Sequence, residues 1–105
     1  MGTLLYGSPP VPFQFDDRAL VHLQAVILAK LRRGEGFCFQ LPTGAALGHG
    51  RRTLWMHPST ALAFTLRGTA EVAPNPLWLR ALMAEANSSR GLSVLPEPPA
   101  TAPAP

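Results

Sequence analysis

The chain has little charge, one cysteine and no long apolar run, and each shortage excludes a class of protein. Only 14% of its 105 residues are charged, which is low for a soluble domain. The single cysteine, Cys38, excludes an internal disulfide and fits a reducing cytosol. No apolar run approaches the roughly 18 residues of a membrane span, and the start of the chain lacks the regions of a signal peptide. We therefore expect a cytoplasmic protein that does not enter a membrane.

The residues that metal centres and catalytic sites need are also scarce. The histidines, His22, His49 and His57, include no closely spaced pair, and Cys38 has no second cysteine with which to form a metal motif. The serines lack the Gly-x-Ser-x-Gly turn of hydrolases. The acidic residues lie at positions that structural roles explain, such as helix caps, turns and loops, and not beside a catalytic partner. The sequence therefore predicts no metal, no cofactor and no catalytic residue, and it leans towards a protein that is not an enzyme.

What the chain does have is a marked amphipathic helix at residues 17–33. Asp17 is its expected N-cap and Gly34 its expected left-handed stop. Its apolar stripe, with steps of three and four, consists of Leu20, Val21, Leu23, Ile27, Leu28 and Leu31. The opposite side carries Arg18, His22, Arg32 and Arg33. That side is either a solvated surface or a docking surface for phosphate or an acidic partner.

The rest of the chain alternates in the manner of strands. Strands are predicted at residues 3–6, 11–15, 37–41, 52–57, 62–67 and 92–95. Pro12 lacks an N–H group, so the second strand should either lie at a sheet edge or have that position facing away from its neighbour. Asn75 and Pro76 are the expected N-cap and first residue of a second helix, which places Trp78 on its apolar face.

This order, β-β-α-β-β-β-α-β, predicts an α+β fold. The simplest architecture is a two-layer sandwich, in which a mostly antiparallel sheet carries both helices on one face. Residues 1–95 should form a single domain. Residues 96–105, rich in proline and alanine, should form a disordered tail.

Two further segments are candidates for binding. The glycine-rich stretch at residues 43–53 includes Arg51 and Arg52 after its glycines, but it lacks the Gly-Lys-Ser/Thr of a Walker A loop and does not open a helix. It is either a strand connection or an anion site. Trp55 shares one face of its strand with Arg51, Thr53 and His57. An open face would be an aromatic and cationic platform of the kind that single-strand binders use, whereas a covered face would belong to the core.

The candidate residues for nucleic-acid or anion binding are therefore all basic or aromatic. They are Arg18, His22, Arg32, Arg33, Arg51, Arg52 and Trp55. A net charge of +3 and a pI near 10.0 make the chain mildly basic, which supports nucleic-acid binding only weakly.

Short motifs also relate the chain to a known family. They are LYGSP at 5–9, DDR at 16–18, HL at 22–23, KLRR at 30–33, GR at 50–51, TLW at 53–55, HPS at 57–59, WL at 78–79, ANS at 86–88 and GL at 91–92. Through them the chain resembles a short actinobacterial family of unknown function, whose members are often labelled ATP-dependent DNA ligase. The resemblance implies no established activity and no site residues.

The residues argue against ligase activity. A ligase of that kind forms a lysyl-adenylate in a Lys-x-Asp-Gly motif, whereas the only lysine, Lys30, is followed by Leu31-Arg32-Arg33. The sequence favours a small non-enzymatic module that binds a macromolecular partner, either another protein or a second copy of itself. The alternative is a basic accessory protein that binds nucleic acid, and a ligase-type enzyme is the least favoured.

Overall fold

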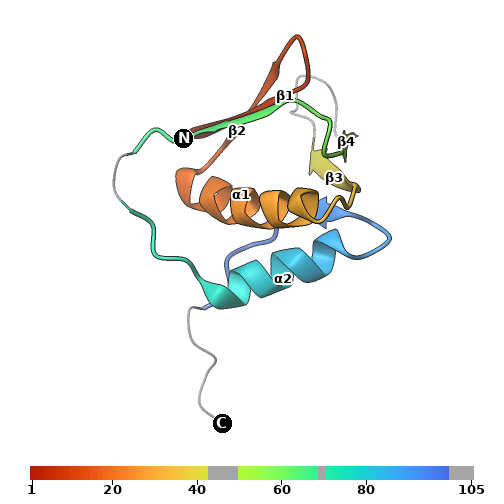
Figure 1. Ribbon diagram of the computed structural model, residues 1–105. Helices are drawn as coiled ribbons and strands as arrows, with labels where there is room; N and C mark the ends of the chain where they lie inside the picture. Colours follow the sequence, from red (N-terminus) through yellow and green to blue (C-terminus); the bar gives the residue numbers. More distant parts are fainter. Residues whose placement is uncertain (43–49, 69–70, 100–105) are drawn as a thin grey trace.

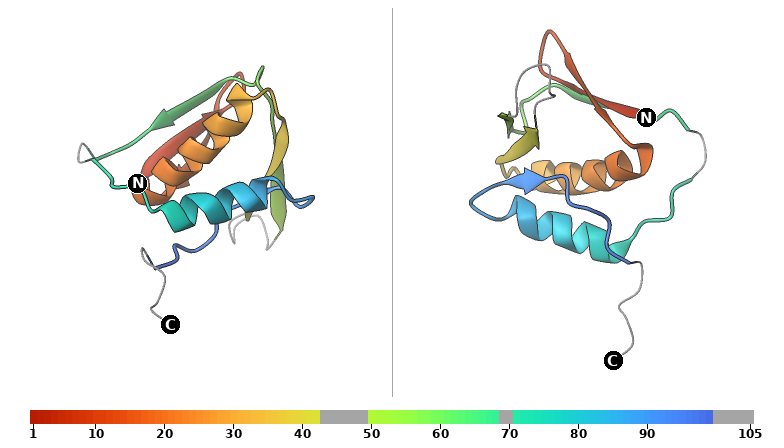
Figure 2. Two further views of the ribbon diagram at one scale, coloured as in Figure 1. Left: turned by 60° about the horizontal axis from the view of Figure 1, so that its bottom comes forward. Right: turned by 180° about the vertical axis from the view of Figure 1, so that it is seen from behind.

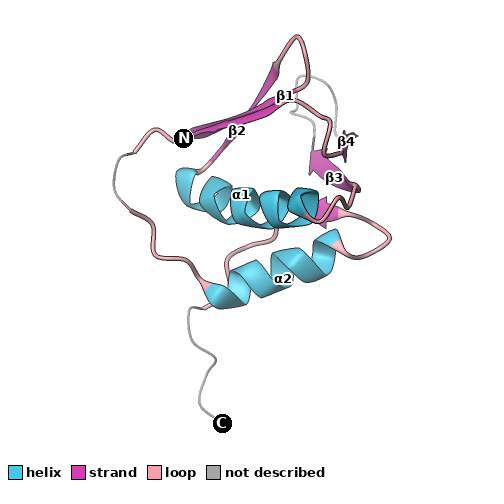
Figure 3. Cartoon of the chain, viewed as in Figure 1, coloured by secondary structure: helices cyan, strands magenta, loops and turns pink. Residues whose placement is uncertain are grey.

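The structure is a computed structural model that describes residues 1–42, 50–68 and 71–99 (Figure 1). Its elements, in order, are β1 (Gly2–Tyr6), β2 (Val11–Phe15), α1 (Asp17–Arg32), β3 (Phe37–Pro42), β4 (Arg51–Met56), β5 (Leu62–Thr65), α2 (Pro76–Ala86) and β6 (Leu92–Ser93). Figure 3 colours them by type. The α+β class and the order of the elements are as the sequence predicts. No helix in the described ranges is long and apolar enough to cross a membrane.

The strands form two sheets of three rather than one sheet. Sheet A has the order β2-β1-β5 with antiparallel pairs throughout. Sheet B has the order β4-β3-β6, in which β3 is antiparallel to β4 and parallel to β6. The division arises because the chain leaves β4 through a turn at residues 57–60 and returns to pair with β1. As Pro12 predicts, β2 lies at a sheet edge.

The helices stack on one another instead of lying side by side on a sheet. Helix α1 lies between sheet A and α2, and sheet B stands across the end of the stack at which α1 finishes (Figures 1 and 2). α1 contacts β1 on one side and α2 on the other. It is therefore covered on two sides, which the two-layer arrangement expected from the sequence did not include.

One core joins all the layers. Its fully buried apolar side chains are Leu4, Leu20, Leu23, Ile27, Phe39, Met56, Leu82 and Leu92. The rings of Phe15 in sheet A and Phe39 in sheet B stack with their centroids 6.1 Å apart. The Tyr6 hydroxyl of sheet A donates a hydrogen bond of 2.8 Å to the backbone carbonyl of Trp55 in sheet B. These two contacts connect the sheets directly.

The ends of α1 differ in one respect from the prediction. Asp16 is the N-cap in place of Asp17, and its carboxylate accepts from the backbone N–H groups of Arg18 and Ala19. The Asp17 carboxylate instead accepts from the N–H groups of Gly68 at 2.8 Å and Arg67 at 3.2 Å, which lower the pKa of Asp17. Asp17 is the first helical residue, so its side chain is free to hold the segment that follows β5.

The other predicted helix signals are confirmed. Gly34 has a φ of 74° and follows the C-cap Arg33. Asn75 caps α2 by accepting from Leu77 and Trp78, and Pro76 is the first helical residue.

Candidate binding sites

His22 is buried rather than exposed, so it cannot serve the surface role that the sequence suggested. Its Nδ1 lies 2.7 Å from the carbonyl of Arg18, and the backbone N–H of Asn75 donates to its Nε2 at 2.8 Å. A carbonyl only accepts, so the ring is the neutral tautomer with its proton on Nδ1. The ring also packs on Trp78, with the centroids 4.5 Å apart. The surface prediction was wrong because α2 covers this side of α1.

Arg18 is held by an acidic partner. Its Nε and Nη2 each donate to the Glu97 carboxylate at 2.7 Å, and Nη1 donates to the Ala73 carbonyl at 3.2 Å. The bonds from Arg18, together with one from the Asn75 amide, lower the pKa of Glu97 to about 2. The carboxylate is therefore ionised at neutral pH and balances the charge of Arg18.

Glu97 lies in the segment that the sequence assigned to the tail. In the structure this segment contacts the folded body, because the Asn75 amide donates to Glu97 at 3.0 Å and to the Pro98 carbonyl at 2.9 Å. No local pattern marks Glu97 as a partner of Arg18, from which it is separated by 79 positions. Residues 100–105 lie outside the described residues.

The four remaining arginines of the predicted set are exposed and lie at two places. Arg32 and Arg33 lie at the end of α1, and Arg51 and Arg52 lie at the start of β4. Within the described ranges none of the four forms an ion pair with a carboxylate. The guanidinium of Arg52 lies 5.6 Å from the ring centroid of Phe13. Residues 43–49 of the glycine-rich stretch lie outside the described residues.

Trp55 stands on an open face of sheet B. Its side chain is 55% exposed. Arg51 and Thr53 are exposed on the same face, while Leu54 and Met56 are buried on the other. Across the sheet, Trp55 pairs with Cys38 and Thr53 pairs with Gln40. β3 and β4 contain no acidic residue. Of the two alternatives for this face, the structure therefore has the open one, with an aromatic ring and a cation.

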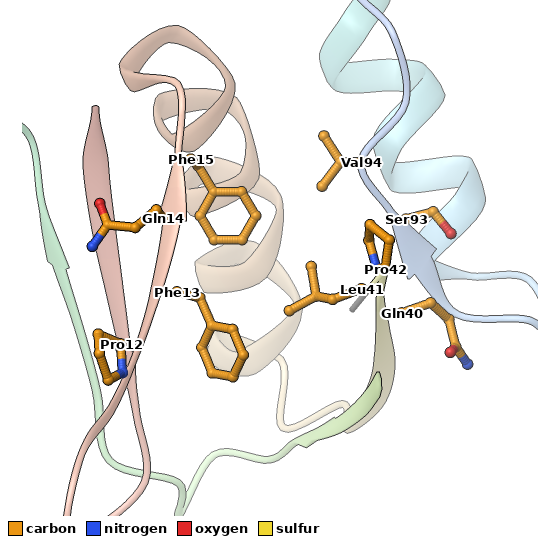
Figure 4. Close-up of a pocket in the computed structure, with 9 residues that line it drawn as sticks. All are labelled: Pro12, Phe13, Gln14, Phe15, Gln40, Leu41, Pro42, Ser93 and Val94. Atoms are coloured by element: carbon orange, nitrogen blue, oxygen red, sulfur yellow. The ribbon is translucent and has the colours of Figure 1, made fainter. Parts of the chain in front are cut away.

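A cleft of about 700 Å³ separates the two sheets (Figure 4). It is lined by Pro12, Phe13, Gln14, Phe15, Gln40, Leu41, Pro42, Ser93 and Val94. Phe13 and Phe15 point from β2 towards Leu41 and Val94 on the opposite wall. Four consecutive residues of β2 line the cleft, so the edge of β2 that pairs with no other described strand faces the cleft. A volume in the range of about 300–1,000 Å³ is typical of ligand sites.

Sequence reasoning missed this cleft. Its walls come from three segments that are separated along the chain, and its only signal was the assignment of β2 to an edge by Pro12. The cleft cannot be inferred without knowing that the strands divide into two sheets. No group of three histidine, cysteine or acidic residues in the described part of the chain could hold a metal ion.

Comparison with known proteins gives one match. A family model described as Domain of unknown function (DUF7882) matches residues 1–97. No curated protein and no solved structure matches the chain.

Proposed function

Since the chain belongs to the DUF7882 family, whose domain has no assigned function, we propose its role from its own surfaces: it is a non-enzymatic module that binds another protein. The binding site is the cleft between the sheets, and the ligand is an extended apolar segment of the partner that carries an acidic residue. The single free thiol of Cys38 supports a cytoplasmic setting for this role.

The cleft supports an extended segment for two reasons. Among the described residues, the edge of β2 has no strand partner on its cleft side, so its backbone groups can pair with a strand of the ligand, the mode called β-augmentation. The half-buried ring of Phe13 and the partly exposed side chain of Val94 offer apolar contact for alternate side chains.

Charge supports an acidic ligand. None of the residues that line the cleft is acidic. Arg52 stands over the ring of Phe13 at the margin of the cleft and has no carboxylate partner in the described residues. A carboxylate of the partner would therefore find a free cation at this place.

Peptides selected from a random display library against the whole chain would test this role. We expect selection of alternating apolar residues beside an acidic one. Phe13→Ala should weaken binding of the strongest synthetic peptide about tenfold or more, because a buried aromatic anchor contributes about 2 kcal/mol. Val11→Ala is the matched control, since Val11 is exposed on the same strand but does not line the cleft, and it should leave the affinity within about twofold.

Two results would overturn the cleft as the binding site. One is that no peptide is enriched, and the other is that the enriched peptides bind Phe13→Ala as tightly as the unchanged chain. Sedimentation provides a further measurement. A dimer that Phe13→Ala dissociates would identify the partner as a second copy of this chain.

The open face around Trp55 favours a second candidate function, the binding of single-stranded nucleic acid. Stacking of a base on an exposed aromatic side chain contributes about 1–3 kcal/mol. Arg51 on the same face has no carboxylate partner in the described residues and can contact a phosphate. The absence of acidic residues from β3 and β4 removes the repulsion that would oppose a strand of phosphates.

Fluorescence polarisation with a labelled ten-nucleotide single strand at about 50 mM salt would test this candidate. Trp55→Ala should weaken binding about tenfold, and Arg51→Ala should reduce the salt dependence by about one charge. Arg80→Ala, on the exposed side of α2, is the matched control and should change neither. Absence of binding to DNA and RNA at this salt concentration would exclude the candidate.

A further inference from the structure

The only lysine of the chain is buried beside a small pocket. Lys30 is 6% exposed, although it is charged and lies near the end of α1. Its Nζ donates to the Asn87 side-chain oxygen at 2.6 Å and lies 3.0 Å from a Glu35 carboxylate oxygen. An ammonium group has three N–H donors. Asn87 and Glu35 are the oxygen partners of Lys30 in the described part of the chain, and Nζ also lies 5.9 Å from the centroid of the Phe37 ring.

The pocket, of about 280 Å³, opens beside the exposed face of Trp55. Its walls are the start of β3, the side chain of Trp55 and the segment that follows α2. Among the lining residues, those with polar side chains are Lys30, Asn87, Ser88 and Ser89. Gly36 allows the indole to lie against the backbone, since a Cβ there would be only 2.8 Å from Cζ2 of Trp55. The pocket thus combines an aromatic wall with a set of hydrogen-bonding groups.

The polar groups are suited to an uncharged acceptor. Lys30 is already balanced by Glu35, so an anion would have to compete with that carboxylate. The Asn87 oxygen is occupied by Lys30, which leaves its NH₂ group as a donor. Ser88 donates to the Glu85 carbonyl, which leaves the lone pairs of its hydroxyl as acceptors. Two donors and neighbouring acceptors match a flat ring that has carbonyl oxygens and an N–H group.

We propose that this pocket binds a nucleobase that carries carbonyl groups, stacked on Trp55 and with one carbonyl accepting from Lys30. Thymine and uracil have this chemistry, whereas adenine has no carbonyl. The proposal rests on the second candidate function and specifies what the Trp55 face recognises. The base belongs either to a free nucleoside or to a single strand, and the two sources are distinguished by experiment.

The test compares three probes: uridine, a ten-nucleotide thymine strand and a ten-nucleotide adenine strand. The thymine strand should bind about tenfold tighter than the adenine strand, because a hydrogen bond from a charged donor contributes about 1.5 kcal/mol or more. Lys30→Met should remove this preference while keeping the length of the side chain. Binding of uridine alone would identify a nucleoside site, whereas binding of the thymine strand without uridine would identify a strand site.

A second variant tests the pocket independently, in case Lys30→Met does not fold. Ser89 is exposed at the pocket, so Ser89→Leu should fill the pocket without entering the core and should also remove the thymine preference. Ser59→Leu, in the exposed turn after β4, is the matched control and should keep the preference. Unfolding midpoints of all three variants would show that each is folded.

The outcomes separate this proposal from the functions on which it builds. The proposal that the pocket binds the base would be overturned if the two strands bound equally, or if Ser89→Leu kept the thymine preference. If Trp55→Ala still weakened the binding of both strands, the proposal that the open face binds nucleic acid would be retained. Absence of binding by all three probes would overturn both, and the protein-binding role of the cleft would be unaffected.

Discussion

His22→Ala is expected to lower the free energy of unfolding by about 3 kcal/mol. The substitution removes the acceptor of the Asn75 N–H, a group that would then be buried at the start of α2 without a partner. It also removes a ring that packs between Arg18 and Trp78, which leaves a cavity between the two helices. An unsatisfied buried donor alone costs about 1–3 kcal/mol.

Urea unfolding followed by far-ultraviolet circular dichroism would measure this loss. His57→Ala is the control, because the His57 side chain is exposed after β4 and accepts a hydrogen bond of 3.1 Å from the Ser59 N–H beside it. It should cost about 0.5 kcal/mol or less. Equal losses in the two variants would contradict the buried position of His22 and the stacking of α2 on α1.

Gly91→Ala is expected to destabilise the fold by more than about 3 kcal/mol, for a different reason. Gly91 is buried with a φ of 86°, where a Cβ is strained. That Cβ would also collide with the backbone carbonyl of Cys38 and lie 2.9 Å from the Cys38 Cβ. Backbone atoms of β3 cannot move aside without disturbing the pairing of β3 with β6.

Gly34→Ala separates the two contributions. Gly34 has a similar φ of 74°, but a Cβ there would meet nothing within 4 Å. The free energy of unfolding of Gly34→Ala should therefore fall only by the cost of placing an alanine at a positive φ, which is about 1 kcal/mol. The same urea experiment on both variants would give the difference between them. Equal losses would show that the close approach of Gly91 to β3 is absent in solution.

The elements were predictable from sequence because their signals are local. Asn75 and Pro76 specify the start of α2 through neighbouring N–H groups, and Gly34 specifies the end of α1. The division of the strands was not predictable in this way. Leu4 pairs with Phe64 across 60 positions, and alternation along one strand carries no information about its neighbour.

The candidate sites were predictable only in part. Alternation in β4 placed Trp55 and Arg51 on one face, but only the burial of Leu54 and Met56 decided that this face is open. The prediction failed for His22 because the second helix covers it. For Lys30 the sequence made no prediction, because a single positive charge on a helix gives no sign of burial beside a pocket. Long-range packing determined each of these outcomes.

The hydrogen bond from Tyr6 to the Trp55 carbonyl connects sheet A with the strand that carries the open face. Tyr6 belongs to sheet A and Trp55 to sheet B, so a ligand that moved the two sheets apart would stretch this bond. If the cleft and the open face both bind as proposed, one coupling free energy would link their affinities. By thermodynamic reciprocity, a strand bound at the face would then change the affinity of the cleft for its peptide by the same factor as the peptide would change the affinity of the face for the strand.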